Sequence, residues 1–555
     1  MKKIIGFFIA LTLLVTLVAC GKKPKATVEN QVVKRSSITF DLKVDDKDIV
    51  TKGSVLVNFY KISKKEETLF TTKTLTTFSE SVAVTGLDSD TKYRADVVCT
   101  YNKKAHIIYS WAFTTIASGT EYDPIMITTA QELVDSFASD YSSDAFYCLA
   151  NDIDFSGMTD FTGISNTSSA AFCGHLDGKN FKIKNATLST NQTYNGFFGY
   201  LKGTIENVTF DNIKISVERT STTTTYSGLV CGYAYQAKMN NVQVTNSTLT
   251  VNCKTQYNGG LAGYGFASNF NFCKLNGVEI NSKGGTTVYT GGLTAYLCQN
   301  SSNKYGKIYG SSVNGKMNVT GATTLNFGGA VGCLKAGASI DRVITDIDAT
   351  ITTTGLTKVG GVIGQANLNS VAEDTYVKNV VSKGKITYKT SNGTDITEAT
   401  DTVMVGGLIG SATAVIVDSA YVEIDLDIEA KIDENKGLYS ALVFGNGFEA
   451  HTELHKAVIN GTITAVTDES HADANINIHG YDGSTYINAG DEKPSSTIDS
   501  NNVKYVKIEI DIDGSVQTYP NPIDIATSQA QANWDTNIWD VTPNGTDKLT
   551  IAFKN

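Results

Sequence analysis

Acidic side chains recur at alternating positions in the second half of the chain, as Asp346 and Asp348 and again as Asp425 and Asp427. Paired carboxylates on one face of adjacent strands could catalyse the cleavage of a glycosidic bond, either by hydrolysis or by an elimination reaction. Carboxylates that alternate along a single strand are instead typical of a solvated strand face. We therefore predict no catalytic residue.

An enzyme that acts on polysaccharides, a lyase or a hydrolase, is the main alternative. Such an enzyme needs paired carboxylates, or a carboxylate with a strong base, on adjacent coils. After residue 118, arginine occurs only as Arg219 and Arg342, which are far apart in the sequence. We accordingly expect a protein that is not an enzyme.

Two short segments contain residue types that bind metals. The segment His451–His455 (HTELH) differs from the H-E-x-x-H pattern that places two histidines on one helix face. On a strand, residues four apart are well separated along the axis. The segment Asp511–Gly514 (DIDG) lacks the other ligands of a calcium loop and is better explained as a hairpin turn. We predict no metal site and no cofactor.

A short glycine-rich core recurs along the chain, and its period indicates one structural unit stacked many times. Successive copies begin 32, 32, 32, 37, 32, 46 and 34 residues apart. Each core is followed by alternating apolar and polar residues, with no helical pattern between them, which predicts strands of a parallel β-helix. The copies begin at Gly196, Gly228, Gly260, Gly292, Gly329, Gly361, Gly407 and Ala441.

Tyrosines follow four of these glycine cores, as Tyr200, Tyr233, Tyr264 and Tyr296. Equivalent positions in consecutive coils stack in register, so these side chains should form a ladder on one flank. An exposed ladder could bind a ligand by stacking on sugar rings, whereas a buried ladder would be part of the core, which is the commoner use. The four tyrosines are our candidate ligand-binding residues.

Short polar side chains also recur before the second strand of several units. In structural terms, stacked amides and carboxylates would satisfy backbone groups at the corners of the coils. These residues are Asn207, Asn241, Asn276, Asn379 and Asp418.

The N-terminus has two lysines, then an apolar run from Ile4 to Ala19 that is short for a membrane span. The residues Leu17-Val18-Ala19-Cys20 resemble the bacterial lipobox. This resemblance implies a diacylglyceryl group on the Cys20 thiol and cleavage just before it. A transmembrane anchor is the alternative. We expect residues 21–555 to lie outside the cytoplasm, at the surface of a membrane.

Charge is unevenly distributed. Residues 21–117 contain 16 Lys and Arg against 11 Asp and Glu, whereas residues 118–555 contain 28 against 45. The basic part would lie next to an anionic membrane surface, and the acidic remainder argues against nucleic acid as a partner. The eight cysteines after Cys20 have no C-x-x-C spacing, so we expect buried thiols, although pairs between adjacent coils remain open.

Residues 37–117 contain short alternating runs that predict a two-sheet sandwich. The segment Leu87–Tyr93 resembles the stretch of fibronectin type III domains that ends in the tyrosine corner. The usual proline is missing. The resemblance implies a spacer or binding module. A linker and a short helix, which begins with the capping box Thr129–Glu132, come next.

The glycine cores with the Ile-x-Asn-Val runs that follow them are similar to the GLUG repeat of bacterial surface proteins. The resemblance covers about residues 172–465 and implies a surface β-solenoid that contacts host, glycan or protein partners. The segment Trp534–Asp540 looks like the close of such arrays and is expected to cap the far end. Breaks in the period, such as Ser391–Thr402, predict protruding loops.

We therefore predict an all-β chain, with a small β-sandwich followed by a right-handed parallel β-helix that has N- and C-terminal caps. Its expected function is that of a lipid-anchored adhesin or glycan- or protein-binding surface protein, with a passive envelope spacer as another possibility. The predicted parts are a signal peptide (1–20), a linker (21–36), the sandwich (37–117), a helix-containing cap (118–190), the repeats (191–465) and irregular last coils with a cap (466–555).

Overall fold

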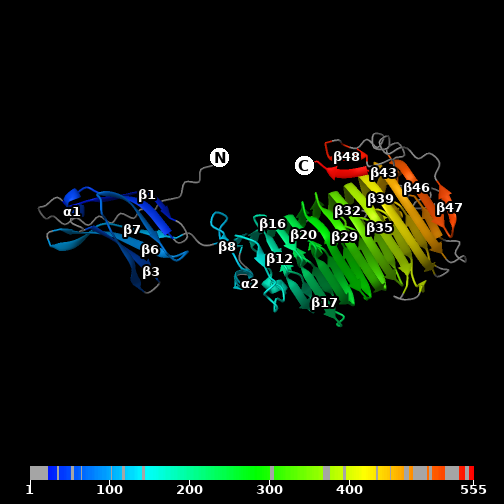
Figure 1. Ribbon diagram of the computed structural model, residues 1–555, viewed down its shortest axis with the longest axis horizontal. Helices are drawn as coiled ribbons and strands as arrows, with labels where there is room; N and C mark the ends of the chain where they lie inside the picture. Colours follow the sequence, from blue (N-terminus) through cyan, green and yellow to red (C-terminus); the bar gives the residue numbers. More distant parts are fainter. Residues whose placement is uncertain are drawn as a thin grey trace. The chain divides into compact units, whose positions relative to one another are not determined.

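The chain, described here by a computed structural model, divides into two compact units, Met1–Ile125 and Met126–Asn555 (Figure 1). Cys20 and the rest of the lipobox lie outside the described residues. Among the residues that are described, no helix is long and apolar enough to cross a bilayer. The undescribed segments are 1–22, 34–36, 52–54, 64–65, 102, 116–118, 140–143, 300–304, 367–374, 392–395, 433–435, 450–451, 468–473, 479–496, 499–502, 519–534, 536, 544–548 and 555.

The N-terminal unit is a β-sandwich, as predicted. Alternate residues of its strands, such as Ile38, Phe40 and Leu42, point into one apolar core. A short helix, α1 (Lys47–Thr51), joins the two sheets. One antiparallel sheet has the order β1 (Ala26–Val33), β2 (Ser37–Val44), β5 (Ser79–Thr85), and the other has the order β4 (Glu67–Thr74), β3 (Val55–Ile62), β6 (Lys92–Tyr101), β7 (Lys104–Thr114).

Two details of this unit bear on the sequence-based predictions, one on its N-terminal boundary and one on the tyrosine corner. Strand β1 lies within the segment predicted as a linker, because Ala26 and Val28 alternate with polar residues and pair antiparallel with β2. The buried Tyr93 hydroxyl accepts a hydrogen bond of 2.9 Å from the backbone N–H of Asp88. This is the contact by which a tyrosine corner fixes the turn before its strand.

The second unit is a parallel β-helix, as predicted, and its coils pair strand to strand in register (Figure 1). Two of its sheets meet at the glycine cores. One comprises β14 (Tyr194–Asn195), β18 (Thr225–Gly228), β22 (Thr255–Gly259), β26 (Thr287–Gly291), β30 (Thr324–Gly328), β33 (Thr357–Gly360), β37 (Val403–Gly406), β40 (Leu438–Ala441) and β44 (Ala474–Asn477). The other comprises β15 (Phe198–Leu201), β19 (Cys231–Tyr235), β23 (Ala262–Phe266), β27 (Thr294–Cys298), β31 (Val331–Leu334), β34 (Ile363–Ala366), β38 (Ile409–Thr413) and β41 (Phe444–Glu449).

The third and widest sheet carries the remaining side of every coil, and we call it the wide sheet. Its early strands are β8 (Ile125–Ile127), β9 (Phe146–Leu149), β10 (Ile153–Asp154), β11 (His175–Asp177), β12 (Lys182–Lys184), β13 (Thr187–Thr190), β16 (Thr204–Asp211), β17 (Lys214–Arg219), β20 (Lys238–Thr245), β21 (Thr248–Cys253), β24 (Asn269–Asn271) and β25 (Lys274–Lys283). Its later strands are β28 (Lys307–Tyr309), β29 (Ser312–Ala322), β32 (Ser339–Thr353), β35 (Thr375–Thr390), β36 (Glu398–Ala399), β39 (Val415–Ile432), β42 (Glu453–Leu454), β43 (Ala457–Thr467), β45 (Thr497–Ile498), β46 (Val503–Ile512) and β47 (Ser515–Thr518).

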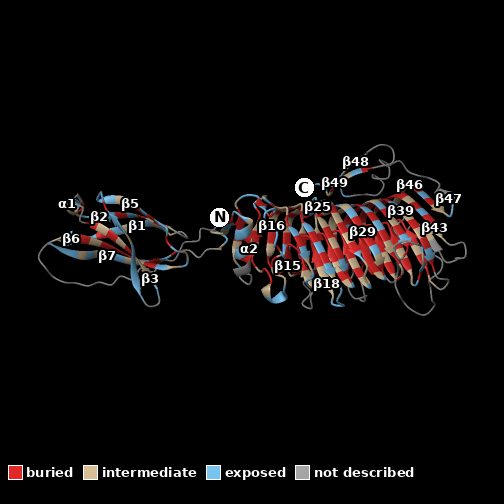
Figure 2. Cartoon of the chain, turned by 60° about the horizontal axis from the view of Figure 1, so that its bottom comes forward, coloured by how far each residue is buried: buried red, intermediate tan, exposed pale blue. Residues whose placement is uncertain are grey.

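The glycine cores are required because the backbone turns sharply there. A Cβ atom on Gly259 would lie 2.0 Å from the carbonyl oxygen of Ala262, well inside van der Waals contact. Inward positions along the strands are buried and alternate with exposed ones (Figure 2). All eight described cysteines are free, as expected of buried thiols.

The first coil is covered by helix α2 (Ala130–Ser139), at the predicted position. The Thr129 hydroxyl accepts a hydrogen bond of 3.1 Å from the N–H of Glu132, which caps the helix. Leu133 and Phe137 are buried, and Phe137 packs its ring 4.6 Å from that of Phe172. The 3-10 turn η1 (Ser168–Ala170) precedes Phe172.

The C-terminal hairpin, β48 (Trp539–Pro543) and β49 (Leu549–Phe553), packs along a flank of the solenoid, whereas the sequence places a cap at the far end. The reason is an outward-facing row of apolar side chains in successive coils that needs cover. Trp539 and Leu549 are buried against this row, which consists of Val381, Tyr421, Val458 and Val506.

Candidate functional site

The four predicted tyrosines form a ladder in consecutive coils. Tyr200 pairs in register with Tyr233, Tyr233 with Tyr264 and Tyr264 with Tyr296. Their ring centroids are 4.9, 4.9 and 4.7 Å apart, with planes 10°, 4° and 13° from parallel. Tyr200 is buried and the other three are half-buried.

A second tyrosine ladder, which the sequence analysis missed, lies beside the first. Its rungs are stacked at 5.6, 5.1 and 4.5 Å, and each meets the first ladder edge to face, as Tyr226 meets Tyr233 at 5.2 Å and 84°. A Tyr-x-Gly pattern at the start of four glycine cores could have revealed it. The rungs are Tyr194, Tyr226, Tyr257 and Tyr289.

The double ladder restricts what these tyrosines can bind. Each inner ring has a neighbouring ring on both faces, so only its edge and hydroxyl face outward. Burial raises the pKa of Tyr200 to about 12. Burial also raises the pKa of Tyr264, and the Cys298 thiol beside its hydroxyl raises it further. Stacking on a sugar ring, which needs a free aromatic face, is therefore closed to the inner rungs.

A groove of about 1110 Å³ runs across the wide sheet, and it begins where a corner of the coil disappears. In early coils Asn212 (φ 54°) or Asn246 (φ 51°) separates two strands. The N–H of Asn246 donates to the carbonyl of Asn276, so the corner continues to Gly277 (φ 64°), an extra residue within β25. From β29 onward the strands run straight through this position, and the outer face is hollowed there.

Glycines alternate with larger residues along the floor of the groove. Val278, Gly315, Ile347, Gly384, Ile424 and Gly461 pair in register, each with the next. A Cβ atom on Gly384 (φ 105°) would lie 2.0 Å from the carbonyl oxygen of Ile347. Gly461 (φ 148°) has the same relation to Ile424, at 2.1 Å. Only glycine fits these positions without strain.

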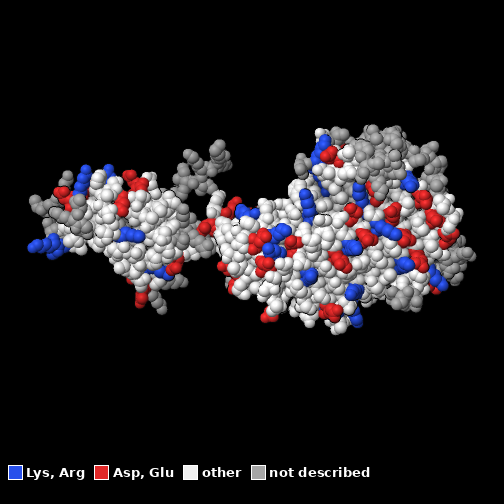
Figure 3. Space-filling view, viewed as in Figure 1, with Lys and Arg blue, Asp and Glu red and all other residues white. Residues whose placement is uncertain are grey.

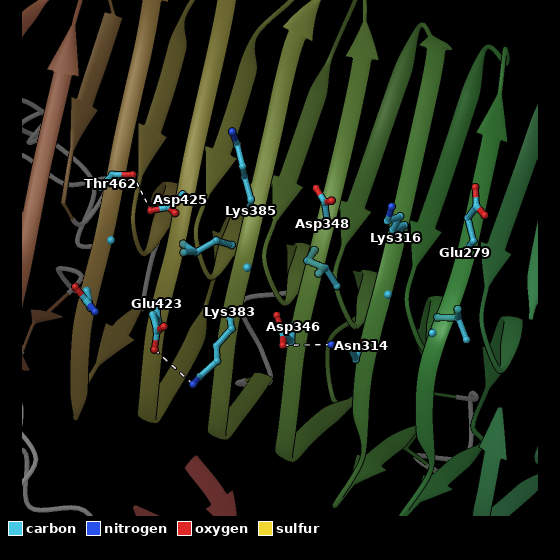
Figure 4. A pocket seen from close by; sticks show the side chains of 18 of the residues that line it. Glu279, Asn314, Lys316, Asp346, Asp348, Lys383, Lys385, Glu423, Asp425 and Thr462 are labelled. Carbon is cyan, nitrogen blue, oxygen red and sulfur yellow. Dashed lines mark hydrogen bonds and ion pairs between the residues drawn. The ribbon is translucent and has the colours of Figure 1, made fainter. Parts of the chain in front are cut away.

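Two rows of polar side chains border this floor, one on each side (Figure 4). Members of a row come from consecutive coils and pair in register. Neither row was recognised in the sequence as a site. The first row is Glu279, Lys316, Asp348, Lys385, Asp425 and Thr462, and the second row is Asn314, Asp346, Lys383, Glu423 and Asn460, with Lys507 near its end.

The C-terminal hairpin holds the second row in place. Lys383 Nζ donates to the backbone carbonyl of Leu549 at 2.7 Å and lies 3.4 Å from Glu423 Oε2. The Tyr421 hydroxyl donates to the same Glu423 oxygen at 2.6 Å and accepts from the Leu549 N–H at 3.2 Å. The hairpin therefore fixes the Lys383 ammonium at the edge of the groove.

The recurring short polar residues serve the corners, as predicted for most of them. Asn241 Nδ2 donates to Asn207 Oδ1 at 3.0 Å, and Asn379 Nδ2 donates to Asp341 Oδ1 at 2.7 Å. Asn207, Asn241 and Asn379 have φ near 50°, where asparagine is favoured. Asn276 differs, because it precedes the extra residue Gly277 at the start of the groove.

The structure describes parts of the two segments whose residue types could bind a metal, His451–His455 and Asp511–Gly514. His455 Nε2 lies 2.6 Å from Glu453 Oε2, while His451 is outside the described residues. The segment Asp511–Gly514 forms the turn between antiparallel β46 and β47, with φ of 51° and 80° at its third and fourth residues. Within the described residues, no three His, Cys, Asp or Glu side chains are grouped as metal ligands.

Comparison with known proteins gives distant likenesses to solved structures. No protein-family model matches the chain, and no curated protein sequence matches it. A solved structure from Bacteroides ovatus, provisionally named an immunoglobulin A1 protease, is 20% identical with a TM-score of 0.35 and covers 56% of this chain and 78% of its own. A structure named IgA1 protease is 14% identical with a TM-score of 0.31 and covers 74% of this chain and 30% of its own.

The names of these two solved structures bear on one prediction, namely that the chain is not an enzyme. Both solved structures carry the name of a protease, which contradicts the prediction that this chain is not an enzyme, and that prediction is withdrawn. The names belong to those two proteins. At this identity and TM-score, they bring no catalytic residue, substrate or activity to the chain described here.

Proposed function

We propose that this chain is a lipid-anchored surface protein whose solenoid binds an extended polysaccharide along the groove of the wide sheet. The observation that carries the proposal is the groove itself. It crosses the coils from β25 to β46, and every coil on the way contributes polar side chains to it. A long, open, polar groove is suited to a chain-like ligand that meets the same kind of contact at each coil.

The chemistry of the groove favours a carbohydrate over a protein partner. Carboxylates, ammonium groups, the amides of Asn314 and Asn460 and the hydroxyl of Thr462 can exchange hydrogen bonds with sugar hydroxyls. A peptide adding to a sheet needs a free edge, whereas these strands already pair with both neighbours. Protein hot spots also need buried aromatic anchors in apolar pockets, and the groove is bordered by charges.

The anchoring part of the proposal rests on the sequence. The lipobox-like residues end at Cys20, and the first described strand begins at Ala26, so only a short segment separates them. Excess lysine and arginine in residues 21–117 would favour an anionic membrane surface next to the anchor. The anchor is tested by Cys20→Ala, which should release the protein from the membrane fraction of the producing cells.

Binding is tested with residues 21–555 and a panel of soluble polysaccharides of different charge. We expect at least one polymer to bind, and the variant Asp348→Lys, which reverses one charge in the groove, to change the affinity for that polymer about tenfold. The matched control is Lys214→Glu, an exposed charge on β17 outside the groove. Binding that is lost instead in the double variant Tyr264→Ala, Tyr296→Ala would move the site to the tyrosine ladder.

A further inference from the structure

The charges along the groove alternate in sign from coil to coil. The charged groups that strand β32 contributes to the groove are all carboxylates, those of strand β35 are all ammonium groups and those of strand β39 are carboxylates again, while β29 contributes one ammonium group (Figure 4). The same interspersion of acidic and basic groups is visible on the face of the solenoid over β29 to β43 (Figure 3). The groups are Lys316 on β29, Asp346 and Asp348 on β32, Lys383 and Lys385 on β35, and Glu423 and Asp425 on β39.

We infer that this groove selects a polysaccharide in which positive and negative charges alternate along the chain. The inference rests on the proposed function, because it names the ligand class of that same groove. Neighbouring strands are about 4.8 Å apart, so charges of one sign recur every second coil, at about 9.6 Å. An extended polysaccharide with a charged disaccharide repeat presents its charges at a similar interval.

A uniformly charged polymer fits this pattern poorly. A polyanion that is charged at every sugar would face Lys316 and Lys385, but it would also face the like charges of Asp348 and Asp425. A polyanion that is charged only at every second sugar could align with the lysines, but it would leave these two carboxylates without a partner of opposite charge. Like charges that face each other across an interface repel and weaken binding. A zwitterionic chain in the matching register avoids this repulsion at every coil.

The charges of the first row on β29 to β39, namely Lys316, Asp348, Lys385 and Asp425, are exposed and available to a ligand. Lys385 lies 3.3 Å from Asp427, and both side chains are about half exposed, at 51% and 48%. Such an exposed ion pair contributes little, so exchanging it for ligand charges costs little. Within the described residues, the side chains of Lys316 and Asp348 have neither an ion-pair nor a hydrogen-bond partner. Lys383 is less free, since the hairpin fixes it, and it supplies a positioned positive charge.

A purely structural explanation also exists. Opposite charges on neighbouring strands attract, and a ladder of them could simply favour the correct register of the coils. The two explanations differ in what a charge change does. A structural ladder predicts a loss of stability with no new binding, whereas a recognition site predicts a changed preference among ligands.

The experiment compares three polymers on residues 21–555: N-deacetylated hyaluronan, which alternates ammonium and carboxylate groups, its parent hyaluronan, which has only carboxylates, and chitosan, which has only ammonium groups. We expect the zwitterionic polymer to bind about tenfold more tightly than either of the others. The variant Lys316→Glu, Lys385→Glu leaves only negative charges in the first row. It should lose the zwitterionic polymer and gain chitosan, while Lys214→Glu, Lys254→Glu changes as many exposed charges elsewhere and should behave as the parent chain.

The outcomes separate the two claims. If none of these polymers and none of the wider polysaccharide panel binds, the proposed function fails. If polymers bind without a preference for the zwitterionic one, or if that preference survives the double groove variant, the groove inference is overturned while polysaccharide binding stands. A thermal melt of each variant shows whether it is folded. Should the double variant be unfolded, Asp348→Asn, which removes one charge and keeps the shape, must reduce the zwitterionic preference.

Discussion

Tyr233 and Tyr264 stack almost parallel in neighbouring coils, with ring centroids 4.9 Å apart and planes 4° from each other. Tyr264 continues the stack to Tyr296 at 4.7 Å and meets Tyr226 edge to face at 5.6 Å. Each ring is therefore held by its neighbours, and the hydroxyls share a partly buried strip. The stacked rings therefore stabilise the solenoid, and we expect this stabilisation to be lost at the alkaline pH at which the hydroxyls ionise.

Alkaline pH should destabilise the solenoid through these tyrosines. Burial raises the pKa of Tyr200 to about 12 and raises that of Tyr233, Tyr264 and Tyr296 above the ordinary value of about 10. Because the folded pKa exceeds the unfolded one, the stabilisation is complete below pH about 10 and is lost as pH rises toward 12 and beyond. Denaturant unfolding measured across this range should show the decline.

The double variant Tyr233→Phe, Tyr264→Phe keeps the stacked rings and removes two titrating hydroxyls. Its loss of stability between pH about 10 and 12 should be shallower than that of the parent chain. Tyr122→Phe, at a side chain 85% exposed, is the control and should leave the decline unchanged. An equally steep decline in the double variant would assign the alkaline transition to other groups.

Gly384→Ala should destabilise the solenoid by about 2–3 kcal/mol, because φ of 105° and a Cβ only 2.0 Å from the Ile347 carbonyl oxygen leave no room for a side chain. The same variant should weaken polysaccharide binding, since the floor of the groove must shift. Gly157→Ala is the matched control: a Cβ there meets nothing within 4 Å, and we expect a change of less than about 0.5 kcal/mol in the free energy of unfolding.

Leu549→Ala should loosen the C-terminal hairpin by about 2–3 kcal/mol, because it removes a side chain only 1% exposed from the contact with Tyr421 and Val458. Hydrogen exchange of the β48 and β49 amides should accelerate, while exchange in β22 and β26 stays slow. Val516→Ala, at a residue 54% exposed, should change neither. Equal acceleration throughout the solenoid would mean that the hairpin and the coils unfold as one unit.

The cysteines should react with an alkylating agent in an order set by burial. Cys173 is half-buried and should be modified first. Burial raises the pKa of Cys273 and Cys333 to about 12, so at neutral pH their thiolate fraction is about a thousandfold below that of an ordinary thiol. Peptide mass spectrometry over time gives the order. Early modification of Cys333 in folded protein would show that its coil opens.

Sequence alone determined the repeated part of this molecule. The period of the glycine cores and the alternation after them depend on neighbours in the chain, and both predict the parallel β-helix in which Tyr200, Tyr233, Tyr264 and Tyr296 stack. The helix at residue 130 was likewise predictable, because its cap at Thr129 is local. Burial of most cysteines was predictable from their spacing and from the small side chains that the cores require, whereas pairing between adjacent coils was left open by the sequence.

Tertiary structure decided the rest. The second tyrosine ladder had a sequence signal, but its edge-to-face contact with the first depends on how sharply two sheets turn at Gly228 and Gly259. The groove depends on the loss of one corner of the coil after Gly277. This loss changes the direction of the side chains at that position, but the alternation of apolar and polar residues in the sequence continues through it. Its charges lie side by side only because residues 37 and 40 positions apart share a register. The hairpin at Trp539 covers Tyr421 through contacts between residues more than 100 positions apart, and local pattern carries no information about such contacts.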